Sequence, residues 1–166
     1  MSLLALTKLL YLAERESMRR YAEPLTGDTP VSMEYGPVLS RTLNLTNGLT
    51  RSDVPGGWDR WIADREGHDV ALRDSATLQD AERDLPALSR ADLNVLADTW
   101  AEFGHMDRWE LVAYTHQHCR EWEDPGASSS VIPPVRLFRA LGYTDEQVEA
   151  AVEHMEERAA LQRALA

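Results

Sequence analysis

The chain has 166 residues, of which 43% are hydrophobic and 27% charged, and its formal net charge is −11 at pH 7. This composition is typical of a soluble globular chain and excludes a disordered one, and no apolar run approaches the roughly 20 residues that a membrane span needs. The negative field of such a chain opposes approach to DNA, so we expect neither nucleic acid nor a membrane as a partner, and a basic protein fits better.

The start of the chain predicts a long helix followed by a turn. Within residues 3–21, one stripe at helical spacing consists of Leu6, Leu10, Ala13 and Ser17, and Leu9 and Leu12 widen it. The next segment, EPLTGD at residues 23–28, is typical of a turn, because its proline fixes φ and Gly27 permits a positive φ.

The segment MEYGPVLS, residues 33–40, follows and places a glycine beside a proline. Residues 31–35 alternate apolar and polar side chains, as in a half-buried strand. After Gly36 we expect a helix that opens at Pro37 and ends near residues 47–48. Helix N-termini can bind phosphate, but one glycine followed by a residue without an N–H is a poor cradle, so we expect no phosphate site.

The middle of the chain carries weaker signals. Residues 55–57 contain a proline and two glycines and predict a loop. The apolar segments 61–63 and 70–72 flank the polar segment DREGHD and predict a small hairpin. Residues 74–86 show no hydrophobic period, which favours a surface loop.

Cap signals divide the C-terminal half into four further helices. Ser89 and Asp92 begin a helix that ends at Gly104, and the prolines at 133–134 begin a short one that ends at Gly142. The other two starts are predicted capping boxes, formed by Asp107 with Glu110 and by Thr144 with Gln147.

Together these elements predict a mainly α fold. We expect a single compact helical domain of about six helices with a small β-hairpin or short strand element. This one domain is expected to occupy residues 1–166, with the last helix continuing to about residue 165. No internal repeat indicates a second domain.

The segment THQHCREW, residues 115–122, concentrates residue types that carry metal or nucleophilic chemistry. A zinc ion needs three or four converging ligands, whereas His116 and His118 point about 200° apart on a helix. Cys119 is the only cysteine, which excludes an intrachain disulfide, and the spacing supplies no oriented base for a nucleophile. We expect no catalytic residue, metal or cofactor here, and we interpret Thr115 and His116 as a buried polar pair that supports the core.

Residues 137–154 have the spacing of a helix-turn-helix. The second helix of that motif needs Arg, Lys, Asn or Gln on its exposed face to read DNA. This helix instead offers acidic side chains: Asp145, Glu146, Glu149, Glu153, Glu156 and Glu157. We interpret its outer face as solvated or as a docking face for a basic partner.

Large aromatic side chains are candidates either for interface anchors or for the core. Aromatic residues dominate binding hot spots, but most of them fill protein interiors. We expect the core for most of these residues: Tyr11, Tyr35, Trp100, Trp109 and Trp122.

Several motifs follow one another along the chain: KLLYLAERE at 8–16, PLTGD at 24–28, MEYGPVLS at 33–40, LSRADLNVL at 88–96, WELVAYTH at 109–116, EW at 121–122, VIP at 131–133 and ALGYTDEQV at 140–148. The ordered set resembles the Panacea domain family, whose founding members are SocA-like antitoxins of bacterial and phage-associated toxin–antitoxin pairs. The resemblance covers about residues 8–152. Where many members carry a glycine after the first helix, this chain has Ala22.

The single cysteine and the lack of a signal-peptide pattern or an apolar span predict a cytoplasmic protein. The resemblance implies that it is not an enzyme and that it binds and neutralises a cognate, co-encoded toxin. Some SocA-like members act as adaptors that hand the toxin to a AAA+ protease, so such a protease is a second partner that the resemblance allows. At the rigid corner that MEYGPVLS forms, we expect contacts with the partner from Tyr35, Gly36, Pro37, Ser40 and Arg41.

The residues leave two other functions open. One is a hydrolase-like enzyme that uses His116 with a nearby carboxylate. The other is an autoregulatory DNA-binding protein, which the acidic charge opposes.

Overall fold

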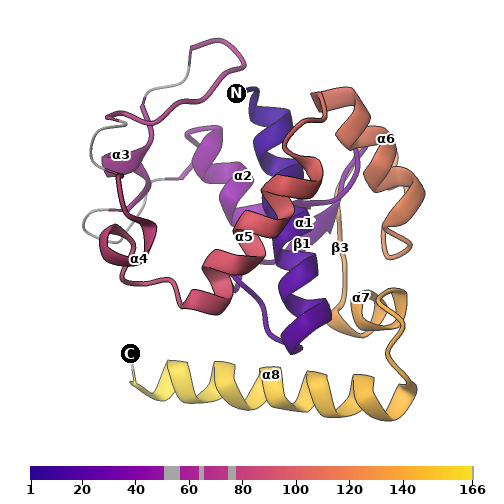
Figure 1. Ribbon diagram of the computed structural model, residues 1–166. Coiled ribbons are helices and arrows are strands. Elements are labelled where there is room, and N and C mark those ends of the chain that lie inside the picture. The colour runs from indigo at the N-terminus through magenta and orange to yellow at the C-terminus, as the bar shows by residue number, and fades with distance from the viewer. Residues whose placement is uncertain (51–56, 64–65, 75–77, 166) are drawn as a thin grey trace.

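The computed structural model describes residues 1–50, 57–63, 66–74 and 78–165, and it is mainly helical with a small antiparallel sheet (Figure 1). This confirms the predicted fold class. The helices are α1 (Leu3–Tyr21), α2 (Ser40–Thr46), α3 (Trp58–Trp61), α4 (Ala81–Asp84), α5 (Arg90–Phe103), α6 (Arg108–His118), α7 (Pro134–Ala140) and α8 (Asp145–Leu165). The strands are β1 (Pro30–Ser32), β2 (Val38–Leu39) and β3 (Ser130–Val131). Among the described residues, no helix is both long and apolar enough to cross a bilayer.

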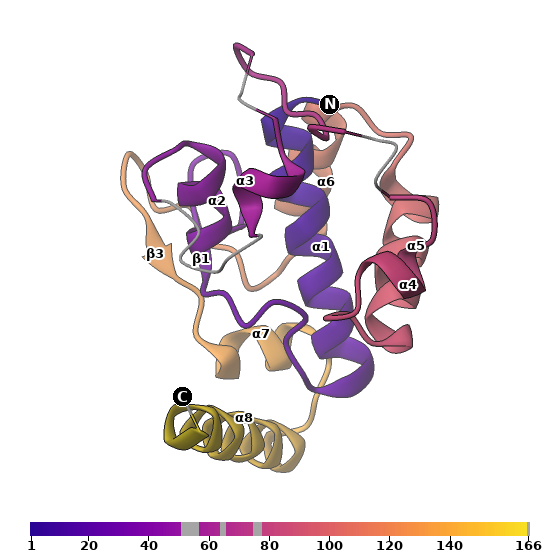
Figure 2. The same cartoon turned by 90° about the vertical axis from the view of Figure 1, so that its left-hand side faces the viewer.

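Helix α1 lies in the middle of the molecule, with other elements on several sides of it (Figure 1 and Figure 2). It packs against α2, α5, α6, α7 and β2, and it begins and ends at the predicted residues. The predicted apolar stripe was too narrow, because a central helix is covered on more than one face. Leu6 and Leu10 are only half-buried. Ala13 and Ser17 of the stripe are buried, and so are polar side chains outside it, namely Thr7, Lys8 and Glu14.

The sheet has the strand order β2-β1-β3, and both pairs are antiparallel. β1 and β2 form a hairpin in which Val31 pairs with Val38. Val31 also pairs with Val131 of β3, which comes from a distant part of the sequence. The strand β3 was not predicted, because its two exposed residues carry no alternating pattern.

The junction after the first strand differs from the prediction. The strand expected over residues 31–35 ends at Ser32, and the helix expected from Pro37 begins only at Ser40. The physical reason is that Val38 is buried and pairs with β1, so its backbone groups are satisfied in a sheet before the helix begins. The C-terminal end of α2, with Asn47 as its cap, is confirmed.

In the middle of the chain, an antiparallel bridge between Ile62 and Leu72 confirms the predicted hairpin. Residues 64–65 of its turn lie outside the described residues, as do residues 55–56 of the predicted loop. Residues 74–86 were predicted as loop, but α4 forms within them, and 75–77 are not described. A helix of four residues is about one turn, which is too short for a hydrophobic period to reveal.

The helix starts predicted in the C-terminal half are confirmed. Both hydrogen bonds of each capping box are present, at Ser89 with Asp92, Asp107 with Glu110 and Thr144 with Gln147. α7 begins at Pro134, next to the predicted proline pair. Helix α8 packs through Val148 and Ala151 onto the same buried cluster as Phe138 and Tyr11, while its acidic side chains are exposed.

Candidate functional site

The turn between β1 and β2, residues 33–37, forms what we call the hairpin corner. The Gly36 N–H donates to the Met33 carbonyl oxygen at 2.9 Å, and the Trp122 indole N–H donates to the same oxygen at 2.9 Å. Gly36 has a φ of +93°, which residues with a Cβ rarely adopt. A Cβ there would also lie 2.7 Å from Thr115 Oγ1 in α6. Glycine is therefore required by the backbone angle and by the close approach of α6.

Beneath the hairpin corner lies Lys8, which is the only lysine in the chain and is fully buried. Its Nζ donates a hydrogen bond to the Pro37 carbonyl oxygen at 2.9 Å, which ties the corner to α1. Burial lowers the pKa of Lys8 to about 7, because the charged amine loses its hydration, and the nearby Cys119 opposes this only in part. Near neutral pH the amine therefore exists in both protonation states.

Two carboxylates fix the turn that precedes the hairpin. Glu14 of α1 accepts hydrogen bonds from the backbone N–H and the hydroxyl of Thr26, at 2.8 and 2.9 Å. Asp28 accepts the backbone N–H groups of Arg41 and Thr42, at 2.9 and 2.7 Å, and so caps the start of α2. The PLTGD segment thus holds α1 and α2 together.

A second buried network joins α1 to the residues that follow α6. Glu121 is fully buried and accepts hydrogen bonds from the Tyr11 hydroxyl at 2.7 Å and from Arg15 Nε at 2.8 Å. Burial, and after it the Glu121 carboxylate, raises the pKa of the Cys119 thiol to about 12. Cys119 therefore stays protonated near neutral pH and is not an activated nucleophile.

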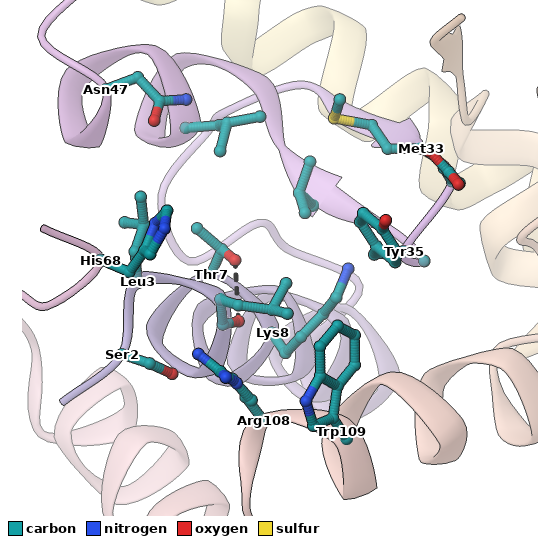
Figure 3. Close-up of a pocket in the computed structure, with 15 residues that line it drawn as sticks. Ser2, Leu3, Thr7, Lys8, Met33, Tyr35, Asn47, His68, Arg108 and Trp109 are labelled. Carbon is teal, nitrogen blue, oxygen red and sulfur yellow. Dashed lines mark hydrogen bonds between the residues drawn. The ribbon is translucent and has the colours of Figure 1, made fainter. Parts of the chain in front are cut away.

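An apolar pocket of about 590 Å³ opens beside the hairpin corner (Figure 3). Its walls come from four places: the start of α1 with Leu3 and Leu4, the hairpin with α2 and its Leu43, the start of α6, and His68. Tyr35 and Trp109 border it, with their ring centroids 5.9 Å apart in an edge-to-face arrangement. A volume of this size lies within the range of about 300–1,000 Å³ that is usual for binding pockets.

Few charged side chains line this pocket. Arg108 reaches from α6 toward the start of α1, and its guanidinium carbon lies 5.5 Å from the Trp109 ring centre (Figure 3). It is exposed, and it forms no ion pair with any residue that the structure describes. Glu34 and His68 also line the pocket and are exposed, whereas Lys8 lines it as a fully buried side chain.

The structure separates the five residues that were predicted to contact a partner. Tyr35 is half exposed and lines the pocket together with Gly36. Gly36 and Pro37 are buried, so they shape the corner and offer little surface. Ser40 is half-buried and Arg41 is exposed at the start of α2, and neither lines the pocket.

The aromatic residues divide between the core and the surface. Tyr11 is fully buried and Trp122 is half-buried, as expected for core residues. Tyr35, Trp109 and Trp100 are 50%, 53% and 55% exposed, so the expectation that most of the five lie in the core is not met. Trp100 belongs to a different surface region, on α5.

Thr115 and His116, which were predicted to form a buried polar pair, lie in different environments. Thr115 is fully buried and its hydroxyl donates to the Val112 carbonyl oxygen at 2.9 Å. His116 is exposed and stacks on Trp122 with ring centroids 4.1 Å apart, because neighbouring positions on α6 face different directions. Partial burial, together with the charge of Lys8, lowers the pKa of His116.

The histidines of α6 do not converge on a common point. His118 stacks on Tyr114, with ring centroids 4.4 Å apart, and so points away from His116. Within the described residues, no group of three or more His, Cys, Asp and Glu side chains is placed to hold a metal ion. His116 hydrogen-bonds with the backbone of Glu34, and in the described part of the chain no carboxylate accepts a hydrogen bond from its ring, as a hydrolytic pair would require.

The sequence reasoning missed Lys8 and Arg108. The signal for Lys8 was its uniqueness: a single lysine amid the apolar residues of a helix, in a chain whose other basic side chains are arginines, indicates a specific buried role. The signal for Arg108 was its position beside Trp109 at a capped helix start, which exposes both side chains.

Comparison with known proteins gives one match. The family model described as "Antitoxin SocA-like, Panacea domain" matches residues 6–123, which is more than half of the chain. The match contains the hairpin corner and the whole of α6, and it ends before β3, α7 and α8, short of the residue 152 that the motifs suggested. No curated protein and no solved structure matches significantly.

Proposed function

The chain belongs to the Panacea domain family of SocA-like antitoxins, and from this premise we propose that it neutralises a cognate toxin protein by binding it directly. The binding face in this proposal is the hairpin corner with the start of α6. Tyr35 supplies contact surface, Ser40 and Arg41 extend the face along α2, and the buried Gly36 and Pro37 hold its shape.

One observation carries the proposal: two large aromatic rings, those of Tyr35 and Trp109, are about half exposed beside an apolar pocket. Exposed aromatic surface next to a concave apolar site is typical of a protein-binding hot spot. Both residues lie within the segment that matches the antitoxin family.

We further propose that the whole chain acts as one domain in the cytoplasm. In support, Phe138 of α7 and Val148 of α8 belong to the same buried cluster as Tyr11 and Leu111. Helices beyond the family-matched segment thus share one core with it.

Co-expression with the product of the neighbouring open reading frame tests the proposal. We expect growth rescue and a complex that co-purifies, and neither in cells that carry the toxin alone. Repeating the assay in a host without the AAA+ protease separates the two mechanisms: rescue persists if binding alone neutralises the toxin, and disappears if the protein is a proteolytic adaptor. Absence of both rescue and complex in the first host contradicts the proposal.

The enzyme and DNA-binding alternatives receive less support. His116 stacks on Trp122 and hydrogen-bonds with the Glu34 backbone, while Asp124 acts on it through its charge. The outer face of α8 is acidic. A His116→Ala variant that folds normally but loses a measured hydrolytic turnover would favour the enzyme. A salt-dependent gel shift on the protein's own promoter would favour the DNA binder.

A further inference from the structure

The pocket beside the hairpin corner is bordered by three side chains of the types that dominate binding hot spots, Tyr35, Arg108 and Trp109. They contact one another in a row, since the Tyr35 ring meets the Trp109 ring edge-on and the Arg108 guanidinium lies over the Trp109 ring. None of the three is buried. Exposed aromatic surface of this kind usually marks a site that a binding partner covers.

The walls of the pocket are held in place before any partner arrives. Lys8 fixes the corner through Pro37, and Trp122 fixes it through Met33. The capping box of α6 fixes the backbone that carries Arg108 and Trp109. A preformed site loses little conformational entropy on binding, which favours affinity.

The charge of the pocket differs from that of the molecule. The chain has a net charge of −11, yet the exposed, ion-pair-free cation at this pocket is Arg108, within the part of the chain that the structure describes. Glu34 is the carboxylate that lines the same pocket. A guanidinium that already lies against an aromatic face presents its N–H groups to a carboxylate in a fixed geometry.

We propose that the pocket holds one large apolar side chain of the toxin and that a toxin carboxylate beside this side chain pairs with Arg108. This inference rests on the proposed function, because it assigns the toxin as the occupant. The apolar walls at Leu3, Leu4 and Leu43 match the side chain, and Arg108 matches the acidic group. The occupant is thus an acidic–apolar segment of the toxin, and it binds although the rest of this chain repels negative charge.

The test measures the affinity of the purified chain for the product of the neighbouring open reading frame, by calorimetry or interferometry. Trp109→Ala is expected to weaken the complex by roughly 30-fold or more, as for a hot spot. Trp100→Ala removes an equally exposed tryptophan on α5 and is expected to leave the affinity unchanged. Arg108→Gln is expected to weaken binding about tenfold and Arg108→Glu further, whereas Arg120→Glu makes a similar charge change at an exposed arginine after α6 and has little effect.

The outcomes separate the two levels of the proposal. If the unaltered chain does not bind, the proposed function fails. If it binds and Trp109→Ala binds equally well, the pocket is not the docking site. If Arg108→Glu binds as tightly as the unaltered chain or more tightly, the partner group is not a carboxylate. Light scattering of this chain without toxin tests a further outcome. If Trp109→Ala lowers its molecular mass from dimer to monomer and leaves toxin binding unchanged, the occupant of the pocket is a second copy of the chain, which also overturns the inference. Thermal unfolding of each variant confirms that it is folded.

Discussion

Lys8 Nζ donates a hydrogen bond to the carbonyl oxygen of Pro37 at 2.9 Å, and this contact joins the central helix to the hairpin corner. The amine is fully buried, and its pKa is lowered to about 7 mainly by burial. A charged group of this kind is costly to bury, and the hydrogen bond to the buried Pro37 carbonyl oxygen offsets part of that cost. The stability of the corner therefore depends on the protonation of Lys8.

The first prediction concerns the pH dependence of stability. The folded pKa of Lys8, about 7, lies below its ordinary value of 10.5, so between these values the unfolded chain binds more protons than the folded chain. Burial of the protonated Lys8 amine lowers the free energy of unfolding by its full amount below pH 7, and this loss becomes smaller as the pH rises. We expect the free energy of unfolding to rise between pH 7 and 9, by at most about 1.4 kcal/mol per pH unit.

Urea unfolding of the unaltered chain and of Lys8→Met at several pH values measures this effect. The window ends near pH 9 because the raised pKa values of Cys119 and Tyr11 act in the opposite direction above it. The difference in unfolding free energy between the two proteins should change across the window. If the difference in unfolding free energy between the unaltered chain and Lys8→Met stays constant from pH 7 to 9, the lowered pKa of the buried Lys8 amine is contradicted.

The second prediction separates two reasons for the glycine at the hairpin corner. Gly36→Ala and Gly27→Ala both place an alanine at positive φ, which costs about 1–2 kcal/mol. Only at Gly36 does the new Cβ meet another side chain, Thr115 Oγ1 at 2.7 Å, while nothing lies within 4 Å at Gly27. We expect Gly36→Ala to destabilise by roughly 1–3 kcal/mol more than Gly27→Ala in thermal or urea unfolding. Equal losses would mean that α6 can move away at little cost.

The third prediction is a stabilising substitution at the end of α1. Ala22 caps this helix with φ 56° and ψ 23°, a left-handed conformation that suits glycine better. We expect Ala22→Gly to raise the free energy of unfolding by about 1 kcal/mol. The same substitution at Ala97, which is exposed within α5, is the matched control and should lower it by about 1 kcal/mol. A loss at both positions would contradict the observed backbone conformation.

The fourth prediction concerns the buried carboxylate of Glu121. Arg15 is its ion-pair partner at 2.8 Å, so Arg15→Met leaves a buried charge without its cation. We expect a loss of about 3–5 kcal/mol in unfolding free energy. Arg19→Met removes an exposed ion pair with Glu16 on the same helix and should cost less than about 1 kcal/mol. Similar small losses for both variants would contradict a buried ion pair between Arg15 and Glu121 that stabilises the fold.

Local signals in the sequence were enough to predict most of the helices. The capping box at Asp107 and Glu110 and the long helix over residues 3–21 depend on side chains only a few positions apart. The helix start at Ser40 was missed because it is set by the pairing of β2 with β1, and β3 was missed because it pairs across a hundred residues. A strand of two residues is too short to show an alternating hydrophobic pattern in the sequence, so such pairings could not be predicted.

The candidate site was harder to predict than the fold. Tyr35 was singled out from its place in the turn, but the pocket exists only because residues 2–8, 33–47, 68 and 108–109 meet in space. Burial of Lys8 could not be read from the apolar period of α1, since that period assumes one covered face. The exposure of Trp109 follows from the position of α6 at the surface, which depends on tertiary packing.

The central claim is that binding alone neutralises the toxin, and a reconstitution with purified components tests it most directly. The product of the neighbouring open reading frame is assayed for its toxic activity while this chain is added in steps, with no protease present. We predict that the activity falls in proportion to the added chain and reaches zero at a fixed stoichiometry. Toxin activity that stays unchanged at a large excess of the chain would contradict the claim.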